Sequence, residues 1–224
     1  MGDCNDNNAA INPGATEICG NNIDDNCNGQ IDENNCIPSV TFTICNQVWM
    51  LKNLDVSKYR NGDDIPQVTD ATAWAALTTG AWCYYENNSA NGPVYGKLYN
   101  WYAVNDPRGL APAGWHIPTD AEWTTLTDCL GGESVAGGKM KVTGATMWYS
   151  PNTGATNSSG LAGLPGGRRH LDGTFRDVGF IGYWWSSTGG TANAWYRYLR
   201  NNTASAHSAS NDKSIGFSVR CVRD

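Results

Sequence analysis

Apolar and polar residues alternate from Val40 to Leu54, which is the first stretch of the chain with a regular hydrophobic pattern. A period of two is typical of half-buried strands, so this stretch predicts one or two strands. Trp82-Cys83-Tyr84-Tyr85 predicts a further strand. Near the C-terminus, three aromatic or alternating runs at 182–185, 194–199 and 216–222 predict an antiparallel set of strands.

Two helices are indicated by capping signals. Thr119 and Glu122 have the spacing of a capping box ahead of the apolar positions Trp123, Leu126 and Leu130, and Gly131 ends this helix. A shorter helix is predicted from about residue 70 to Gly80, with Thr69-Asp70 as its N-cap. From 131 to 173 the chain is rich in Gly, Ser, Thr and Asn with weak periodicity, so we expect long ordered loops there.

The composition supports a single main domain with many loops. The 224 residues include 26 Gly, 10 Trp and 10 Tyr, and only 16% are charged, which favours an aromatic core with glycine-fixed turns. Such a core contains most of its Trp residues, so we expect Trp184-Trp185 to be core and not a sugar-stacking surface. No run of about 20 apolar residues is present, so we expect no direct membrane insertion. The Met1-Gly2 start lacks a signal segment, and we expect an excised mature fragment.

Charge and cysteine content divide the chain into an acidic segment, 1–36, and a body, 37–224. The segment holds seven acidic residues and no Lys or Arg, whereas the body holds 14 acidic and 15 basic residues. Without a basic face, we expect no nucleic-acid partner. The eight cysteines include no CxxC pair, which favours disulfides and an extracellular or cell-surface location. Their pairing is open among 105 arrangements, with Cys129–Cys221 as our working assignment in the body.

The acidic segment has the spacing of a calcium loop. Residues 24–32 read D-x-N-x-N-G-x-I-D, in which alternate side chains offer oxygens and glycine permits the turn. An EF-hand Glu at the twelfth position is replaced by Asn35, so Asp32 or Glu33 must close the site. Hard oxygen ligands favour Ca2+ over copper, and no organic cofactor is expected. The alternative is a solvated, disulfide-stapled linker. The candidate metal ligands are Asp3, Asn5, Asn7, Glu17, Asp24, Asn26, Asn28, Gln30, Asp32 and Glu33.

Two resemblances follow from longer motifs. The segment from D-C-x-D-N through I-N-P-G-A-T-E-I-C to D-N-C-N-G-Q-I-D-E resembles the MopE-type repeat, whose family name refers to copper binding. The body is similar to the Fibrobacter succinogenes major paralogous domain. The motifs that carry this resemblance are NQVWM at 46–50, NLD at 53–55, YGKLYNW at 95–101, GWHIPT at 114–119, YWWSST at 183–188 and GFSVRCV at 216–222.

The second resemblance implies an α+β fold related to the C-type-lectin-like fold and to formylglycine-generating enzymes, with few short helices, antiparallel strands and long loops. Those enzymes use a C-x4-C pair near the C-terminus, but here Gly216 stands in the first position and only Cys221 matches. His116 has no nucleophile beside it in the sequence and is expected to be structural, and His170 and His207 lack partners at ligand spacing. We therefore expect no enzyme activity. The E-P-N and W-N-D motifs of calcium-dependent lectins are also absent.

A binding surface is predicted around the small, polar stretches 189–193 and 201–212. Lectin-like domains related to this family are targets of diversity-generating retroelements, which never produce Lys, Glu, Gln, Met or Trp from AAY codons, and 201–212 contains none of these. An ordinary polar loop explains the same composition. The candidate ligand contacts are Gly189, Gly190, Thr191, Ala192, Asn193, Tyr196, Tyr198, Arg200, Asn202, Ala204, His207 and Ser208.

The leading hypothesis is therefore an extracellular or cell-surface module that binds a protein or glycan ligand, with its binding surface within 189–214. The second hypothesis is a structural surface or fibre-subunit domain that contacts neighbouring subunits. The third is a divergent oxidoreductase of the formylglycine type, against which Gly216 argues.

Overall fold

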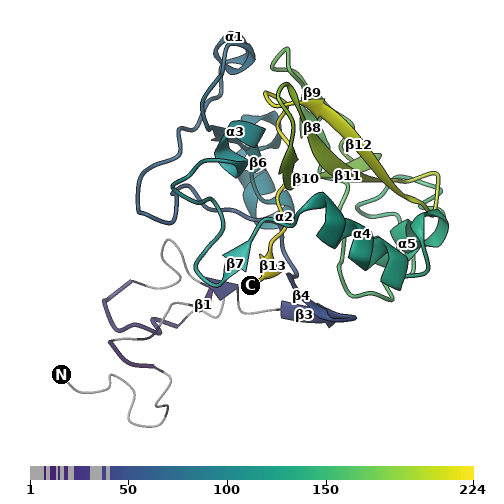
Figure 1. Ribbon diagram of the computed structural model, residues 1–224, viewed down its shortest axis with the longest axis horizontal. Coiled ribbons are helices and arrows are strands. Elements are labelled where there is room, and N and C mark those ends of the chain that lie inside the picture. Colours follow the sequence, from purple (N-terminus) through teal and green to yellow (C-terminus); the bar gives the residue numbers. More distant parts are fainter. Residues whose placement is uncertain are drawn as a thin grey trace.

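The computed structural model describes residues 8, 11–13, 15, 18–19, 23–30, 37–38 and 41–224. Short helices and small sheets surround a central core (Figure 1). The α-helices are α1 (Ala71–Ala75), α2 (Gly92–Tyr95), α3 (Trp101–Val104), α4 (Asp120–Cys129) and α5 (Glu133–Met140), and short 3-10 turns lie at Tyr85–Asn87 and Ser89–Asn91. Helices and strands are mixed along the chain, so the fold is α+β, as the sequence predicted.

The longest strands form a three-stranded antiparallel sheet in the order β10 (Ile181–Gly189), β11 (Asn193–Arg200) and β12 (Ala206–Asp212). Tyr198 is paired with Tyr183 on one side and with His207 on the other. The register between β11 and β12 is continuous, whereas that between β10 and β11 shifts after Trp185. The strand β12 is thus the regular outer edge of this sheet.

A four-stranded sheet has the order β3 (Thr41–Ile44), β4 (Gln47–Met50), β13 (Val222–Arg223) and β7 (Trp115–His116). The first two strands form a hairpin, which confirms the alternation after Val40. The remaining pairs are antiparallel β5 (Trp82–Cys83) with β6 (Leu98–Tyr99), antiparallel β8 (Arg168–Arg169) with β9 (Phe175–Arg176), and parallel β1 (Ile18–Cys19) with β2 (Ile37–Pro38).

Two of the strand predictions need correction. The third strand of the C-terminal sheet is 206–212, which was predicted as a loop, and not 216–222. The run 216–222 crosses the core through single bridges from Gly216, Phe217 and Ser218 to three different segments before it joins the four-stranded sheet. The run 82–85 is a strand only at its first two residues and then enters the turn at 85–87.

Both predicted helix starts are confirmed, whereas α1 ends at Ala75 and not at Gly80. Asp70 caps α1 by accepting a hydrogen bond from the Ala73 N–H, and Thr119 caps α4 in a complete capping box with Glu122. The apolar positions Trp123 and Leu126 of α4 are fully buried, so the helix is stabilised by its caps and by its inner face.

The helix α5 lies in the region predicted as loops. Its sequence contains Gly137-Gly138, which costs about 1 kcal/mol per glycine relative to alanine in a helix interior. Both glycines pack against the turn between β11 and β12. A Cβ at Gly137 would overlap the Ser205 carbonyl, and the Gly138 N–H donates to the Ala204 carbonyl at 2.8 Å. Close approach of the two backbones therefore overrides helix propensity here.

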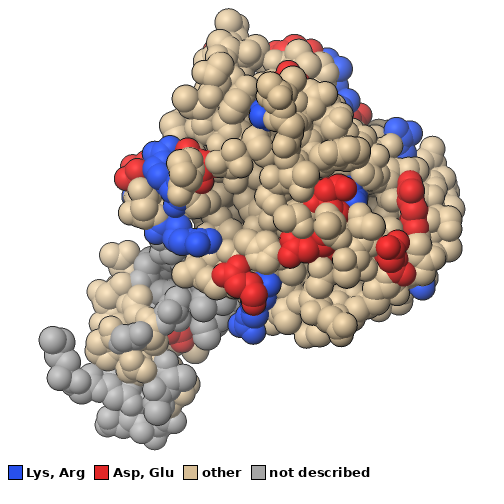
Figure 2. Space-filling view, in the orientation of Figure 1, with Lys and Arg blue, Asp and Glu red and all other residues tan. Residues whose placement is uncertain are grey.

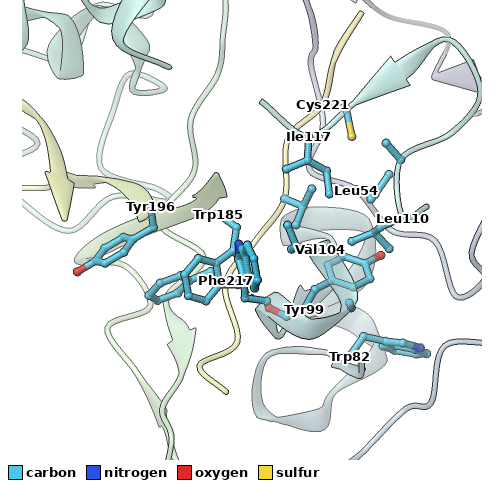
Figure 3. Close-up of a cluster of buried hydrophobic side chains, with 14 of the residues drawn as sticks. Leu54, Trp82, Tyr99, Val104, Leu110, Ile117, Trp185, Tyr196, Phe217 and Cys221 are labelled. Carbon is cyan, nitrogen blue, oxygen red and sulfur yellow. Dashed lines mark hydrogen bonds between the residues drawn. The ribbon is translucent and has the colours of Figure 1, made fainter. Parts of the chain in front are cut away.

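Aromatic rings form most of the core. Seven of the largest fully buried side chains are tryptophans, and two more are tyrosines. Trp184 and Trp185 are 1% and 0% exposed, which confirms them as core. Figure 3 shows Tyr196, Trp185 and Phe217 close together, with Cys221 among aliphatic side chains on the other side of the cluster. The Tyr183 and Phe217 rings are stacked, with centroids 4.8 Å apart.

Several buried cations satisfy the carbonyls of the loops. Lys141 is 0% exposed and its ammonium donates to the carbonyls of Thr153, Arg200 and Thr203, each at 2.9 Å. Burial lowers the pKa of Lys141 to about 8. Arg169 is equally buried and donates to the carbonyls of Gly173, Val68, Thr69 and Asp70. Buried carbonyls outside regular sheets need such donors, because an unpaired one is costly.

The disulfide of the body joins Cys45, in the turn of the β3–β4 hairpin, to Cys129 at the end of α4. The working assignment Cys129–Cys221 is therefore wrong. Cys221 and Cys83 are buried free thiols, and desolvation raises the pKa of each to about 12. Cys221 lies in the core, where it packs as a small apolar side chain.

We predict that Gly137→Ala destabilises the protein by about 1–3 kcal/mol, although alanine favours helix, because the new methyl group meets the Ser205 carbonyl. Gly190→Ala is the matched control, since its Cβ would have only one neighbour, the Asn193 carbonyl at 3.6 Å, and should change stability by less than about 0.5 kcal/mol. Urea denaturation measures both. An unchanged midpoint for Gly137→Ala would show that α5 does not depend on this contact.

Candidate ligand-binding surface

The predicted ligand contacts lie at both ends of the three-stranded sheet. Gly189 to Asn193 form the exposed connection between β10 and β11. The Gly190 N–H donates to the Asn193 carbonyl at 2.8 Å, and Lys213 donates to the Thr191 carbonyl at 3.1 Å. A Cβ at Gly189 would overlap the Trp101 ring, so this glycine is required for packing.

The turn 201–205 lies at the opposite end, about 25 Å away for strands of this length. Asn202 is exposed on the turn. Ala204 faces inward, because its Cβ packs where Gly154 and Gly138 leave room. The prediction of Ala204 as a ligand contact therefore needs correction, since its side chain is occupied by packing.

Strand alternation sorts the remaining candidates onto two faces. Tyr196, Tyr198, Arg200 and His207 share the face that covers the aromatic core, with Tyr198 and His207 stacked at 4.8 Å. Tyr196 is only 8% exposed, so its ring belongs to the core and offers little surface to a ligand. Tyr198 and His207 are half-buried at the border of this face, and Arg200 is exposed with its guanidinium 5.3 Å from the Tyr198 ring centroid.

The opposite face is open at the end near the β10–β11 connection. It carries Trp195, which is 41% exposed, next to the exposed residues Ser208 and Ser210 of β12. Trp195 and Ser210 were not predicted as contacts, although the alternation of β11 and β12 could have placed them beside Ser208. Farther along the same face, Arg197 is buried and bonds the Asp120 carboxylate and the Thr124 hydroxyl of α4.

The candidates thus form no single patch. The exposed ones gather in three places, which are the connection 189–193, the turn at Asn202, and the strip of Trp195, Ser208 and Ser210 between them. The backbone under these positions is fixed by Lys141 at the turn and by Arg197 at α4.

His116 lies between two carboxylates. Its Nδ1 is 2.8 Å from Asp224 Oδ1 and its Nε2 is 2.8 Å from Glu122 Oε1, while the other oxygen of Glu122 accepts the Thr119 N–H. Burial opposes the charged form of His116, but the hydrogen bonds that its ring donates to Glu122 and Asp224 outweigh burial and raise the pKa of His116. Burial also opposes the charged form of Glu122, and bonds from Thr119 and His116 nevertheless lower the pKa of this carboxyl. Both ring nitrogens are engaged, which fits the structural role expected of His116.

The position that would hold the first catalytic thiol is filled. Gly216 lies against Trp74 and Arg169, to which an added Cβ would come within 2.9 and 3.1 Å. The Cys221 thiol is buried, and this burial raises its pKa to about 12.

In the described part of the candidate metal-binding loop, the side-chain oxygens accept hydrogen bonds from the backbone of the loop. Asp24 accepts the backbone N–H groups of Asn28 and Gly29 at 3.1 and 2.7 Å, and the Asn28 side chain accepts the Gln30 N–H at 2.8 Å. Asn26 Oδ1 accepts the Asn28 N–H at 3.1 Å, and Gly29 adopts φ +89°. Carboxylate and amide oxygens on a tight turn fit a hard cation. The candidates Asp3, Asn5, Asn7, Glu17, Asp32 and Glu33 lie outside the described residues.

Among the described residues, no three side chains of His, Cys, Asp or Glu gather as a metal site, and no helix has the length and apolarity to cross a membrane. On the face in Figure 2, acidic side chains form separate small groups around α4 and α5, and Lys and Arg lie singly or beside acids.

The family model for the Fibrobacter succinogenes major domain matches residues 42–223. The chain belongs to this family. A second model, described as "Putative metal-binding motif" of the MopE type, matches residues 3–33. Both resemblances noted from the sequence are thereby confirmed. No curated protein and no solved structure gives a significant match to this member of the Fibrobacter succinogenes major domain family.

We predict that the His116 cluster contributes most stability between about pH 4.5 and 6.5. The contribution of His116, whose pKa is raised from 6.5, is lost as pH rises through its folded value, and that of Glu122, whose pKa is lowered from 4.5, is lost as pH falls through its folded value. Because His116 is partly exposed, the effect is below about 1 kcal/mol. His116→Gln should flatten the unfolding free energy on the alkaline side.

The matched control is His207→Gln. Burial lowers the pKa of His207, so its contribution is present above 6.5 and is lost as pH falls. Urea titrations from pH 4 to 9 distinguish the two, and an alkaline slope that survives in His116→Gln would contradict the assignment.

Proposed function

We propose that this protein is an extracellular or cell-surface ligand-binding module with a C-type-lectin-like body, and that it is not an enzyme. The observation that carries the proposal is a rigid sheet with small, exposed, polar side chains on its surface. Asn202, Ser208 and Ser210 are exposed, whereas Ala206 is buried and His207 and Ala209 are half-buried. A constant core below replaceable surface side chains is typical of binding scaffolds.

Rigid support of this surface comes from charged contacts. Lys141 donates to the Arg200 carbonyl just before the turn 201–205 and to the Thr203 carbonyl within it, and Arg197 connects β11 to Asp120 and Thr124. A surface held in this way loses little conformational entropy on binding. Substitutions at exposed positions leave these anchors intact, so they can change ligand choice without changing the fold.

The same arrangement is compatible with retroelement diversification, which we include in the proposal. Exposed positions such as Asn202 and Ser208 are free to vary, whereas Ala206 is 3% exposed and Ala204 packs against glycines, so variation there is limited to small residues. The gene tests the idea: variable codons should fall on exposed positions of 189–214 and be matched by a template repeat.

Non-enzymatic function is supported by the state of the obvious catalytic groups. The Cys221 thiol is buried beside the core, Gly216 leaves no room for a second thiol, and both nitrogens of His116 are bonded to carboxylates. Extracellular location is supported by the Cys45–Cys129 disulfide and by the MopE-type match. The scattered charges in Figure 2 fit a protein or glycan partner better than nucleic acid.

We further propose Ca2+ as the ion of the N-terminal segment. The donors at Asp24, Asn26 and Asn28 are all oxygens, which suit calcium better than copper. The ion would stabilise the segment, and ligand binding by the body would not depend on it directly.

A structural surface or fibre-subunit role is the second candidate. It is favoured by β12, a seven-residue outer strand with a continuous register and no Pro or Lys within it. Such an edge can pair with a strand of another subunit. A polymer in which 201–212 is buried between chains would support this role.

We predict that Asn202→Lys with Ser208→Lys weakens binding to the ligand found on a glycan and protein array at least tenfold, because two bulky charges then occupy the contact surface. Thr78→Lys with Thr143→Lys, at exposed positions away from the sheet, is the control for charge. Equal loss in both double variants, or no loss in the first, would place the ligand elsewhere. The array is screened with and without calcium.

We also predict that Ca2+ raises the melting temperature of the full chain and that Asp24→Asn removes most of this rise. Asparagine keeps an acceptor for the loop N–H groups but lacks the charge that the ion needs. Asp63→Asn is the control, since Asp63 lies in another Asx turn, with its carboxylate near Arg108. Calorimetric titration with Ca2+, Mg2+ and Cu2+ gives the selectivity, and preference for Cu2+ would overturn the choice of ion.

A further inference from the structure

A cavity of about 350 Å³ lies away from the proposed ligand surface and shares no residue with it. It opens between α2, the segment after β4 and the loops at 147 and 162–164. Its lining residues are Leu51, Lys52, Asn53, Pro93, Val94, Met147, Ala162, Leu164 and Arg220. The volume is at the lower end of the range for small-molecule sites, about 300–1,000 Å³.

The walls of this cavity are tied together from below. Arg220 is 1% exposed and donates to the carbonyls of Met50, Leu51 and Leu161 at 3.1, 2.7 and 2.7 Å, so it joins two walls. Its Nε and a terminal nitrogen also donate to Asn53 Oδ1 at 3.0 and 2.7 Å. The Asn53 amide then donates to the Tyr95 carbonyl of α2 at 2.8 Å, which fixes the third wall.

These bonds make the cavity preformed. The segment after β4, the loop at 161–164 and α2 cannot separate without breaking a bond to the Arg220 guanidinium or the Asn53 amide, which is costly, whereas the loop at 147 lies outside these bonds. A ligand that enters meets walls already in place and loses less affinity to ordering them.

Ala162, which lines this cavity, has a strained backbone conformation. It has φ +52°, a left-handed conformation that is uncommon for alanine, and it is held there by its N–H bond to Asn157 Oδ1 at 2.9 Å. Residues with strained backbones cluster at binding sites, where contacts with the surrounding structure hold them in the unfavourable conformation.

The lining is apolar except for two cations and one amide. Leu51, Pro93, Val94, Met147 and Leu164 supply the apolar walls, Lys52 is exposed at the rim, and no lining residue is acidic. The body as a whole holds 14 acidic and 15 basic residues, whereas this hollow carries only positive charge.

We propose that this cavity binds a small apolar carboxylate, with its hydrocarbon part against the apolar walls and its carboxylate toward Lys52. The hydrocarbon part supplies most of the affinity, because burial of apolar surface contributes about 25 cal/mol per Å². The ammonium group of Lys52 attracts the carboxylate, so the cavity should bind the carboxylate more tightly than a neutral analogue of the same shape. Arg220 holds the walls in place and adds positive potential at the base of the cavity, while its own donors are used by the protein.

Chemical-shift titration of the full chain with 3-phenylpropionate tests the proposal, with 3-phenylpropanol as the neutral probe. We expect saturable shifts at the lining residues and weaker binding of the alcohol. Lys52→Gln should reduce the preference for the carboxylate by about two- to fivefold, as is usual for one exposed charge.

Two valines give a matched pair for steric control. Val94→Trp at the rim should weaken binding at least tenfold, whereas Val135→Trp on α5, at a similarly exposed position, should leave it unchanged (Val94 is 37% and Val135 42% exposed). Absence of saturation at millimolar probe, equal binding by Val94→Trp, or equal affinity for the alcohol would each overturn the proposal. The outcome is independent of the array experiment, because the two surfaces share no residue.

Discussion

Arg220 lies where the N-terminal hairpin, the 161 loop and the last strand meet, and it holds them together without any carboxylate. Its five bonds go to three carbonyls and to the side chain of Asn53, which in turn accepts the Trp184 indole N–H and donates to α2. Burial lowers the pKa of Arg220 to about 9, so it still carries its charge at neutral pH. A chain with so few strand pairs has many carbonyls that no sheet satisfies, and one guanidinium can satisfy several of them.

Arg169 and Lys141 satisfy loop carbonyls in the same way as Arg220. Each lies in the interior and donates to loop carbonyls, and Arg169 also lies over the Trp74 ring at 4.5 Å. The loops of this fold are therefore ordered by long cationic side chains that reach them from elsewhere. The proposed ligand-binding surface is ordered in the same way, because Lys141 fixes the turn that carries Asn202.

The sequence correctly predicted those elements whose signals lie close together in the chain. The caps at Asp70 and Thr119 define helix starts, and the alternation after Val40 defines a hairpin, because each depends on residues close in the chain. It missed α5, whose Gly137-Gly138 forms a helix only because the turn at 204–205 lies against it. It also missed β12, since small polar residues are common in loops and only pairing with β11 makes them a strand.

The candidate surface was also predicted from local sequence patterns, which locate a stretch of chain but do not show which way its side chains face. Composition located the stretches 189–193 and 201–212, but only the strand register shows that Tyr196 faces the core while Trp195 and Ser210 face out. The disulfide is the clearest case in which the sequence alone did not predict the structure. Cys129 pairs with Cys45, which is 84 residues away in sequence, and nothing in the spacing of the cysteines distinguishes this partner from Cys221.

Gly216 has a consequence for which substitutions this part of the core can accept. Its missing side chain is the space that the Trp74 ring and the Arg169 stem occupy. A larger residue at 216 would require Trp74 to become smaller at the same time, and the smaller residue would deprive Arg169 of the ring beneath it. Three positions that lie far apart in the sequence are therefore coupled through packing, so that a change at one of them alone lowers stability.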